Sequence, residues 1–466
     1  MVTETRTPHA LTARHGTAAR RIAESAGATD GAALPTDQFP AWLAGRRRAH
    51  RFHVERIPFA RLQGWSFQES TGNLVHDSGR FFSVEGLHVT VRSTGQEWHQ
   101  PIIRQAEVGI LGILVKEFDG VLHCLMQAKM EPGNPNLLQL SPTVQATRSN
   151  YTQAHRGAAV KYLGHFVGPG RGRVLADSLQ SEHGSWFFRK RNRNMIVEAV
   201  GDVPADDDFC WLTFGQLARL LRHDNVVNMD ARTVLACAPV DTPDGADDRA
   251  LHSDLDLLSW FTDVRARHDV HATRVPLAGL PGWIRTDRAV EHEQGRFFDV
   301  VALAVQAGNR EVTGWTQPLF APRGPGVVAF LSRRIEGRTH VLAHARVEGG
   351  FLDTVELGPT VQYTPGNYAD AAPADRPRHL DTVLTADPAR IRYEALHSEE
   401  GGRFLNAVSR YLIIEAPDDM PSDPGDDYRW VTPGQLSSLV RHGHYLNVQG
   451  RTLLACLHAL DVGGDD

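Results

Sequence analysis

The chain has 466 residues, of which 41% are hydrophobic and 22% are charged, and its net charge is −6. This length favours two domains, and the composition is typical of a globular enzyme. The negative charge argues against nucleic-acid binding through bulk electrostatics. The lack of any apolar run of about 18 residues argues against a membrane-spanning helix.

The N-terminal segment and the cysteines indicate where the protein works. Residues 1–35 are rich in Ala, Thr, Arg and Gly and lack the apolar stretch of a signal peptide, so we expect a poorly ordered leader. The cysteines include no Cys-x-x-Cys pair, which favours free thiols in a reducing compartment. They are Cys124, Cys210, Cys237 and Cys456. We therefore expect a cytoplasmic protein.

The first half of the chain predicts a helix, a β-hairpin and a closing helix, in that order. The helix begins near Phe39-Pro40. Two apolar runs, 108–115 and 121–126, flank Asp119-Gly120, a pair typical of a hairpin turn with positive φ. Thr213 can cap a helix whose leucines follow the i, i+3, i+4 spacing. These leucines are Leu217, Leu220 and Leu221.

The second half repeats these signals after a linker rich in Asp, Pro and Gly at residues 239–256. Trp260 lies in the counterpart of the first helix, and Glu336-Gly337 takes the place of the hairpin turn. Thr432 followed by Pro433 is typical of the start of a helix and predicts the closing one. Mixed strands with flanking helices in each half predict an α+β fold.

Sequence motifs recur in the same order, at offsets of 216 to 219 positions. Gly79-Arg80-Phe81-Phe82 returns as Gly295-Arg296-Phe297-Phe298, and the segment 140–145 returns as 357–362. Chance matches do not keep order and spacing along a whole chain, so the sequence is a tandem duplication of one domain-sized unit. We assign residues 36–238 to the first repeat and residues 257–460 to the second.

Standard catalytic and metal-binding motifs are missing from the sequence. It contains no Gly-x-x-x-x-Gly-Lys-Ser/Thr loop, no Gly-x-Ser-x-Gly elbow and no His-Glu-x-x-His pair. The 23 histidines are scattered without ligand spacing. We therefore expect neither a metal nor another cofactor.

The polar segment 127–156 is the strongest candidate site. It combines amide, carboxylate, amine, hydroxyl and imidazole groups with prolines and glycines, which suits a loop that presents side chains to a ligand. The alternative is a polar loop between strands without a functional role. Retention between the repeats favours a site. The retained residues are Glu131 (Glu348), Thr143 (Thr360), Gln145 (Gln362), Asn150 (Asn367) and Tyr151 (Tyr368).

A second polar segment runs from Ser181 to Asn194 and allows two interpretations. It joins Ser181-Glu182-His183-Gly184-Ser185-Trp186 to Arg189-Lys190-Arg191-Asn192-Arg193-Asn194. A basic edge strand facing solvent is one interpretation. A phosphate-binding face is the other, because the forked guanidinium group suits diphosphate oxygens. The residues leave both open.

These segments carry a family resemblance. The stretches 131–134, 139–147 and 149–152, together with 181–187, 190–195 and 228–233, resemble the NDP-hexose 2,3-dehydratases of deoxysugar biosynthesis. The resemblance extends from about residue 39 to about residue 460 and includes the duplication. Motifs this long and in this order are specific to the family.

The resemblance implies a homodimer that acts on dTDP-4-keto-6-deoxyglucose. It also implies a Nudix-hydrolase-like fold in each half, with one active nucleotide-sugar pocket and one remnant. The metal-binding Nudix box, with its Arg-Glu-x-x-Glu-Glu core, is absent from both repeats. The sequence therefore lacks the carboxylates that a Mg²⁺-dependent diphosphate hydrolysis needs.

The implied reaction eliminates water without redox, so it formally requires neither nicotinamide nor metal. The C4 ketone acidifies the C3 proton, the C2 hydroxyl leaves, and a 3,4-diketone results. A nicotinamide-dependent 3-ketoreductase would use this product downstream. We expect the pocket of the first repeat to be active, because His155, His183 and Lys190 become Ala372, Glu400 and Ala407 in the second.

The candidate residues follow from motif position and from differences between the repeats. Candidates for the base or acid are His155, His183, Glu131 and Tyr151. Candidate donors to O4 or the hydroxyl are Lys129, Asn150 and Gln145, and Lys129 is counted with the catalytic groups. Candidate diphosphate partners are Arg189, Arg191 and Arg193. Further substrate contacts are expected at Gln139, Ser141, Thr143, Arg156, Ser185 and Asn194. Trp98 could stack on the base or pack in the core, as Trp315 repeats it.

Two other functions remain as alternatives. A nucleotide-diphosphate-sugar hydrolase would share the implied fold but would need Mg²⁺. A non-catalytic nucleotide-sugar sensor would bind in both repeats and consume nothing. The missing Nudix box disfavours the first, and the polar differences between the repeats disfavour the second.

Overall fold

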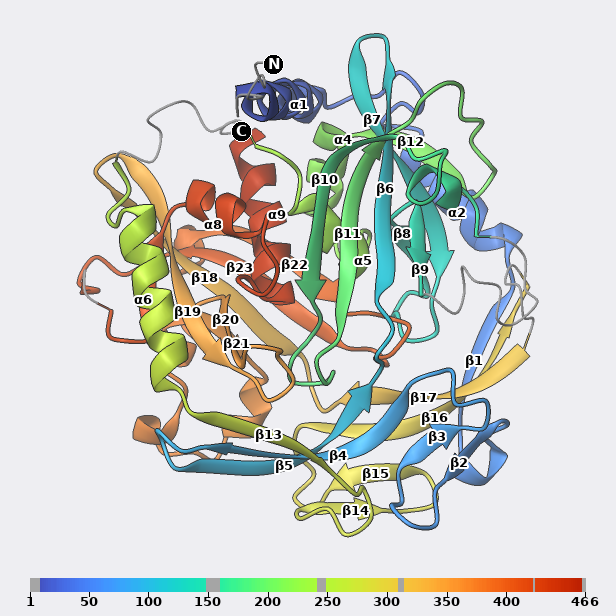
Figure 1. The fold of residues 1–466 in the computed structure, drawn as a ribbon, viewed down its shortest axis with the longest axis vertical. Helices are drawn as coiled ribbons and strands as arrows, with labels where there is room; N and C mark the ends of the chain where they lie inside the picture. The colour runs from blue at the N-terminus through green and yellow to red at the C-terminus, as the bar shows by residue number, and fades with distance from the viewer. Residues whose placement is uncertain (1–8, 148–159, 241–248, 309–313, 422–423, 463–466) are drawn as a thin grey trace, which may run out of the picture.

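The computed structural model describes residues 9–147, 160–240, 249–308, 314–421 and 424–462. The chain forms two seven-stranded and two five-stranded sheets, one large and one small sheet for each half (Figure 1). This is a mixed α/β architecture in which the two halves are similar. It agrees with the α+β fold and the duplication that the sequence predicts.

The first large sheet has the strand order β10-β11-β6-β7-β12, with β8 beside β7 and β9 beside β6. β11 runs parallel to β6, and the other pairs are antiparallel. The predicted hairpin joins β6 to β7 through Asp119 and Gly120, which have φ values of 50° and 81°. The strands are β6 (Gly109–Phe118), β7 (Val121–Met130), β8 (Leu138–Ser141), β9 (Val144–Ala146), β10 (Arg173–Ser181), β11 (Arg191–Glu198) and β12 (Phe209–Thr213).

The second large sheet repeats this topology as β20-β19-β18-β23-β22, with β21 beside β18 and β24 beside β19. β23 is parallel to β18, as β11 is to β6. The turn at Glu336 and Gly337 again has positive φ, at 49° and 79°. The strands are β18 (Gly326–Ile335), β19 (Arg338–Val347), β20 (Val355–Gly358), β21 (Val361–Tyr363), β22 (Ile391–Ser398), β23 (Val408–Glu415) and β24 (Tyr428–Val431).

The two small sheets exchange a strand between the halves. β1 (Phe52–Ile57) of the first half pairs with β16 of the second, and β13 (Val270–Val275) of the second half pairs with β4 of the first. The sheets lie together at the end of the molecule opposite the chain termini (Figure 1). Their other strands are β2 (Trp65–Phe67), β3 (Leu74–His76), β4 (Ser83–Val91), β5 (Gln96–Arg104), β14 (Trp283–Arg285), β15 (Ala289–His292), β16 (Phe298–Ala307) and β17 (Gly314–Pro322).

Helices from both halves pack between the two large sheets (Figure 1). Thr213 and Thr432 cap α4 and α8 with complete capping boxes, which confirms both predicted closing helices. No helix in the described ranges is both long enough and apolar enough to cross a membrane. The helices are α1 (His9–Gly27), α2 (Phe39–Ala49), α4 (Phe214–Leu220), α5 (Met229–Leu235), α6 (Asp254–Arg267), α7 (Leu380–Leu384), α8 (Pro433–Leu439) and α9 (Val448–Val462).

The largest hydrophobic core runs through both halves. It joins Ile113 and Leu140 of the first large sheet to Phe330 and Leu357 of the second, through the helices between them. All four cysteines are free and buried, as expected. The halves therefore share one core.

The segment for which we expect a poorly ordered leader contains helix α1. Its residue Arg21 bonds to Glu198, and the Ser25 hydroxyl donates to the Leu122 carbonyl oxygen. Ile22 is buried against the first large sheet. These polar and apolar contacts hold this part of α1 against the first half. The composition of the segment nevertheless resembles that of a flexible tail.

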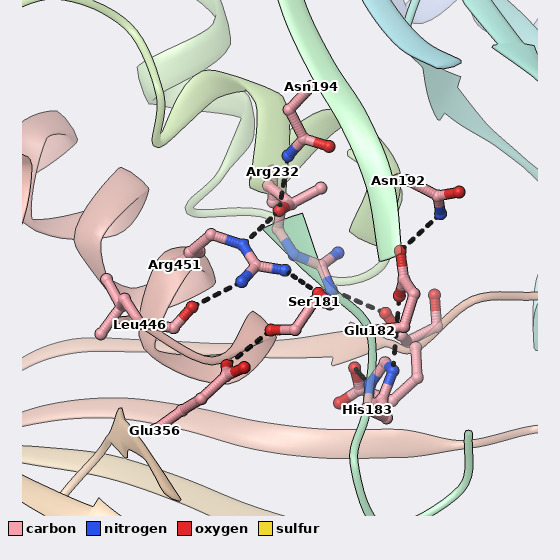
Figure 2. Close-up of polar contacts among 12 residues, drawn as sticks. Ser181, Glu182, His183, Asn192, Asn194, Arg232, Glu356, Leu446 and Arg451 are labelled. Carbon is pink, nitrogen blue, oxygen red and sulfur yellow. Dashed lines mark hydrogen bonds and ion pairs between the residues drawn. The ribbon is translucent and has the colours of Figure 1, made fainter. Parts of the chain in front are cut away.

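Two buried arginines form hydrogen bonds that connect the two halves (Figure 2). Arg232 on α5 donates to the Ser398 carbonyl oxygen at 2.7 Å, and the equivalent Arg451 on α9 donates to the Ser181 carbonyl oxygen at 2.5 Å. Arg451 also donates to the Thr233 hydroxyl at 2.6 Å. These paired contacts fix the segments after Ser181 and Ser398, from which the candidate site is built.

Candidate active site

The turns that follow Ser181 and Ser398 are held by the opposite repeat. The Gly133 amide donates to the Gly401 carbonyl oxygen at 2.7 Å, and the Gly350 amide donates to the Gly184 carbonyl oxygen at the same distance. A Cβ atom at Gly133 would lie 1.7 Å from the Phe404 carbonyl oxygen. Only glycine permits this approach. Each repeat therefore contributes a turn to the other repeat's polar cluster.

The first cluster consists of charged side chains from both repeats: Lys129, Glu131, Glu182, Lys190, Asp230, Glu400 and Arg403. Glu131 accepts a hydrogen bond of 2.9 Å from the Gln145 amide and lies 3.5 Å from the Lys129 amine. Glu131, Glu182 and Asp230 are each 3% exposed. Lys129, Glu400 and Arg403 are half-buried. The first cluster thus brings carboxylates and cations together.

Crowding of the carboxyl groups shifts their protonation. Burial, together with the charges of Glu182 and Glu131, raises the pKa of Glu400 to about 7, although Arg403 opposes the shift. Burial and the neighbouring Glu400 raise the pKa of Asp230 well above its usual range. Burial also lowers the pKa of the Lys190 amine. Carboxyl groups with raised pKa values at one buried site suit general acid–base chemistry.

The second cluster forms around Glu348, the counterpart of Glu131. Glu348 accepts hydrogen bonds from Arg346 at 2.8 Å and Gln362 at 3.0 Å. His183 reaches this cluster from the first repeat and shares a hydrogen bond of 2.8 Å with Glu399. Burial disfavours the charged imidazole, but the bond to Glu399 and the nearby carboxylates raise the pKa of His183 overall.

Comparison with known proteins assigns the chain to a family. The model of the NDP-hexose 2,3-dehydratase family matches residues 36–238 and 254–457. The chain belongs to the NDP-hexose 2,3-dehydratase family. Three relatives carry the name dTDP-4-dehydro-6-deoxy-alpha-D-glucopyranose 2,3-dehydratase.

These relatives match nearly their whole length. The relative from Amycolatopsis orientalis is 60% identical, over 96% of this chain and 95% of its own. The relative from Saccharopolyspora spinosa is 54% identical, over 95% of both chains. The relative from Streptomyces violaceoruber is 52% identical, over 92% of this chain and 98% of its own.

Because each repeat contributes a turn to the cluster of the other, residues that are neighbours along the chain do not always lie in the same cluster. Alignment along the chain groups His183 with Glu131, but in space His183 faces Glu348 and Glu399, while its counterpart Glu400 joins Glu131. The first cluster therefore contains more charged side chains than the second. Going from the first cluster to the second, Glu400 is replaced by His183, Arg403 by Trp186, Asp230 by Gln449 and Lys190 by Ala407.

Four of the predicted residues in the polar segments stabilise the dehydratase framework. The Thr143 hydroxyl donates to the Leu125 carbonyl oxygen and accepts from the Leu114 amide, and Asn194 donates to the Thr233 hydroxyl. Both side chains are at most 2% exposed. Gln139 donates to the Ser398 hydroxyl across the two halves, and the Ser141 hydroxyl donates to Gln145.

Of the predicted diphosphate partners, Arg191 and Arg193 lie on β11, and the Arg189 main-chain amide donates to the Gly350 carbonyl oxygen at 2.7 Å. Arg191 and Arg193 alternate along β11 with the buried Asn192 and Asn194, so they occupy its outer face. Arg193 is paired there with Asp177 at 2.5 Å. The Arg189 guanidinium lies over the Phe188 ring.

Trp98 and Ser185 contact the same side chain. The Trp98 indole donates to Gln100 at 2.9 Å, and the Gln100 amide donates to the Ser185 carbonyl oxygen at 2.5 Å. Trp98 is half-buried and packs beside the buried Leu87 and Val89.

Four further predicted residues, Asn150, Tyr151, His155 and Arg156, lie outside the described residues and stay predictions. Conversely, sequence reasoning did not select Glu182, Asp230, Glu400 or Arg403. A signal was present for Asp230, because it aligns with Gln449 in a motif that retains Asn228, Arg232 and Thr233 as Asn447, Arg451 and Thr452. Glu400 and Arg403 could not be grouped with Glu131 without knowing that the turns are exchanged.

Proposed function

We propose that the protein removes water across C2 and C3 of dTDP-4-keto-6-deoxyglucose, the 4-dehydro sugar named for its relatives. The buried first cluster carries this proposal, because it holds carboxyl groups with raised pKa values beside three basic side chains. The relatives that carry this activity in their names are 52–60% identical to the chain. The product is the dTDP-linked 3,4-diketo-2,6-dideoxyhexose.

The reaction needs a base, an acid and a group that stabilises negative charge on O4. The base removes the C3 proton, and the electron pair of the C3–H bond passes into an enolate on O4. Collapse of the enolate expels the protonated C2 hydroxyl as water and forms a C2–C3 double bond. The resulting enol takes a proton at C2, releases the proton of its C3 hydroxyl and becomes the C3 ketone. Atoms and electrons balance without an oxidant or a reductant.

The first cluster offers a group for each role. Glu400 is the acid, because its raised pKa keeps a substantial fraction protonated near neutral pH. Glu131 is the base, since its bonds to Gln145 and Lys129 suit a negatively charged carboxylate. Lys129 and Gln145 are half-buried donors for the O4 enolate. His183 is a positioning residue between Glu182 and Glu399.

We further infer that each large sheet is a Nudix-like unit and that the first cluster is the active pocket. The mixed sheet with one parallel pair, present in each half, supports a Nudix-like arrangement. Replacement of Asp230 by Gln449 and of Arg403 by Trp186 supports a remnant function for the second cluster.

The proposed partners follow from the family and the product. We propose that the enzyme is a homodimer, which light scattering on the purified protein tests directly. The diketone is reactive, so a nicotinamide-dependent 3-ketoreductase is the class of enzyme that would use it next.

An NMR experiment tests the reaction. Metal-stripped protein is incubated with dTDP-4-keto-6-deoxyglucose in deuterated water, with a nicotinamide-dependent 3-ketoreductase present to trap the product. A 2-deoxy-4-keto sugar with deuterium at C2 is expected. Sugar phosphate that forms only after Mg²⁺ is restored would instead indicate a hydrolase. Unchanged substrate with binding in both pockets would indicate a sensor.

A further inference from the structure

A compact group of potential metal ligands lies on the outer face of β4 and β5, away from both polar clusters. His88 on β4 pairs directly with His99 on β5, and Glu97 lies one position along the same face, opposite Thr90. The two imidazole rings stack with centroids 4.3 Å apart. The His88 Nε2 atom lies 2.7 Å from the Glu97 carboxylate. One ligand atom from each of the three residues lies within 4.8 Å of the others.

We propose that His88, Glu97 and His99 bind a divalent transition metal of the zinc class. Two imidazoles and one carboxylate are a frequent ligand set for zinc, with bonds of roughly 2.0–2.2 Å, and water completes a four-coordinate shell. Imidazole ligands favour zinc, copper or nickel over the harder magnesium and calcium. Small side-chain rotations would bring the three atoms to bonding distance.

The surroundings favour an ordered site. The residues beneath it, Leu87 and Val89, are fully buried, so the strand that carries His88 is anchored on its inner face. The His99 carbonyl oxygen accepts a hydrogen bond of 2.9 Å from the Trp283 indole of the second repeat.

The duplication provides an internal comparison. The positions in the second repeat that correspond to His88, Glu97 and His99 are occupied by Ala304, Gly314 and Thr316. β16 and β17 nevertheless form the same antiparallel pair, with Ala304 opposite Thr316 as His88 lies opposite His99. The fold therefore does not require ligating residues here, and the first repeat has all three. The spacing of the three residues in the sequence does not reveal the group, because its members come together only when β4 pairs with β5.

The site would tie β4 to β5 in the sheet that also receives β13 from the other half. A bound metal stabilises the folded state by mass action, because the unfolded chain does not bring the three ligands together. We expect the effect on stability and not on dehydration, since none of the three residues belongs to the first cluster.

Zinc binding to the metal-stripped full-length protein tests the proposal. Equilibrium dialysis against Zn²⁺ should show about one tightly bound ion per chain, and zinc should raise the melting temperature. His88→Ala and His99→Ala should each weaken zinc binding by more than about tenfold, in line with the loss of a ligand. His271→Ala is the matched control, because His271 lies on the neighbouring strand β13 and forms an ion pair with Asp269 at 2.9 Å; the variant should bind zinc as the wild type does.

The alternative outcomes are distinct. Equal zinc affinity and stoichiometry in wild type and His99→Ala would show that the ion binds elsewhere and would overturn the proposal. Failure of the wild type to bind zinc at roughly 100 μM would also overturn it. Melting curves without zinc show whether each alanine variant is folded, and dehydration assays on the same samples report the first cluster separately.

Discussion

Glu131 and Glu400 belong to different repeats, yet they share one buried cluster because Gly133 and Gly401 are joined by a hydrogen bond between their main chains. The proposed reaction site is therefore assembled from both halves. A substitution in the second repeat can act directly on groups supplied by the first. Four predictions follow from this arrangement and from the contacts that maintain it.

Glu400→Gln should lower turnover by about 10²–10⁴-fold, which is the usual contribution of one general acid. The amide keeps the shape of the side chain but cannot supply the proton. Turnover of the wild type should fall as the pH rises through about 7, where Glu400 loses its proton, and the variant should lose this dependence. The measurement is the initial rate of product formation by NMR across the pH range.

Glu394→Gln is the matched control for this experiment. Glu394 lies four strand positions before Ser398 on the exposed part of β22 and is paired with Arg410 at 2.6 Å. Its substitution should leave the rate and its pH profile unchanged. Equal rates in Glu400→Gln and the wild type would contradict the assignment of the acid.

The free energy of unfolding should also depend on the protonation of Glu400. Folding raises the pKa of Glu400 from its ordinary 4.5 to about 7, so the folded state binds this proton more tightly than the unfolded state. The stabilising contribution is complete below pH 4.5 and is lost as the pH rises through 7. Urea unfolding between these pH values should therefore show a smaller loss of stability in Glu400→Gln than in the wild type. A parallel pH dependence in both proteins would contradict the raised pKa.

Gly133→Ala should destabilise the protein and also inactivate it. Its Cβ atom would meet the Phe404 carbonyl oxygen at 1.7 Å, and relief of this contact must move the turn that carries Glu400 and Arg403. Overpacking of this kind costs about 1–3 kcal/mol or more. We expect a lower melting temperature and a loss of turnover of more than about tenfold, as expected when catalytic geometry shifts by about 1 Å.

Two glycine variants serve as comparisons. Gly350→Ala creates the equivalent clash, at 1.9 Å from the Phe187 carbonyl oxygen, but at the second cluster. It should destabilise the protein to a similar extent and retain more turnover. Gly366→Ala adds a methyl group to open space and should change neither property. A greater loss of turnover in Gly350→Ala than in Gly133→Ala would place the reaction at the second cluster.

Arg451→Ala should be strongly destabilising. The guanidinium is fully buried and donates to the carbonyl oxygens of Leu446 and Ser181 and to the Thr233 hydroxyl. Leaving buried acceptors without donors costs about 1–3 kcal/mol each, so we expect a total loss of at least about 3 kcal/mol in urea unfolding. Arg441→Ala, at an exposed arginine near α8, is the control and should remain within about 0.5 kcal/mol of the wild type.

Local signals in the sequence predicted the local structure well. Asp119-Gly120 and Glu336-Gly337 form the expected hairpin turns, because their positive φ values are set by neighbouring residues. The helices that begin at Thr213 and Thr432 follow in the same way from their capping residues. The repeat itself was also visible, since equivalent motifs keep their order.

The pairing of strands that lie far apart in the sequence cannot be predicted from the pattern of a single sequence. Nothing in β1 or β13 indicates that its partner lies in the opposite half, because either small sheet would accept an alternating strand of this kind. The same limitation affected the site. Comparison by position kept His183 with Glu131, whereas the exchanged turns bring Glu400 to Glu131.

The exchange of β1 and β13 gives one polypeptide the contacts of a two-fold, strand-swapped pair of chains. Covalent fusion of such a pair makes its assembly independent of protein concentration, since a linker holds the partners at an effective concentration of roughly millimolar. Fusion also removes a constraint on evolution. In a symmetric pair, every substitution appears in both pockets at once, whereas in the fused chain Glu400 could serve one pocket while His183 came to occupy the other.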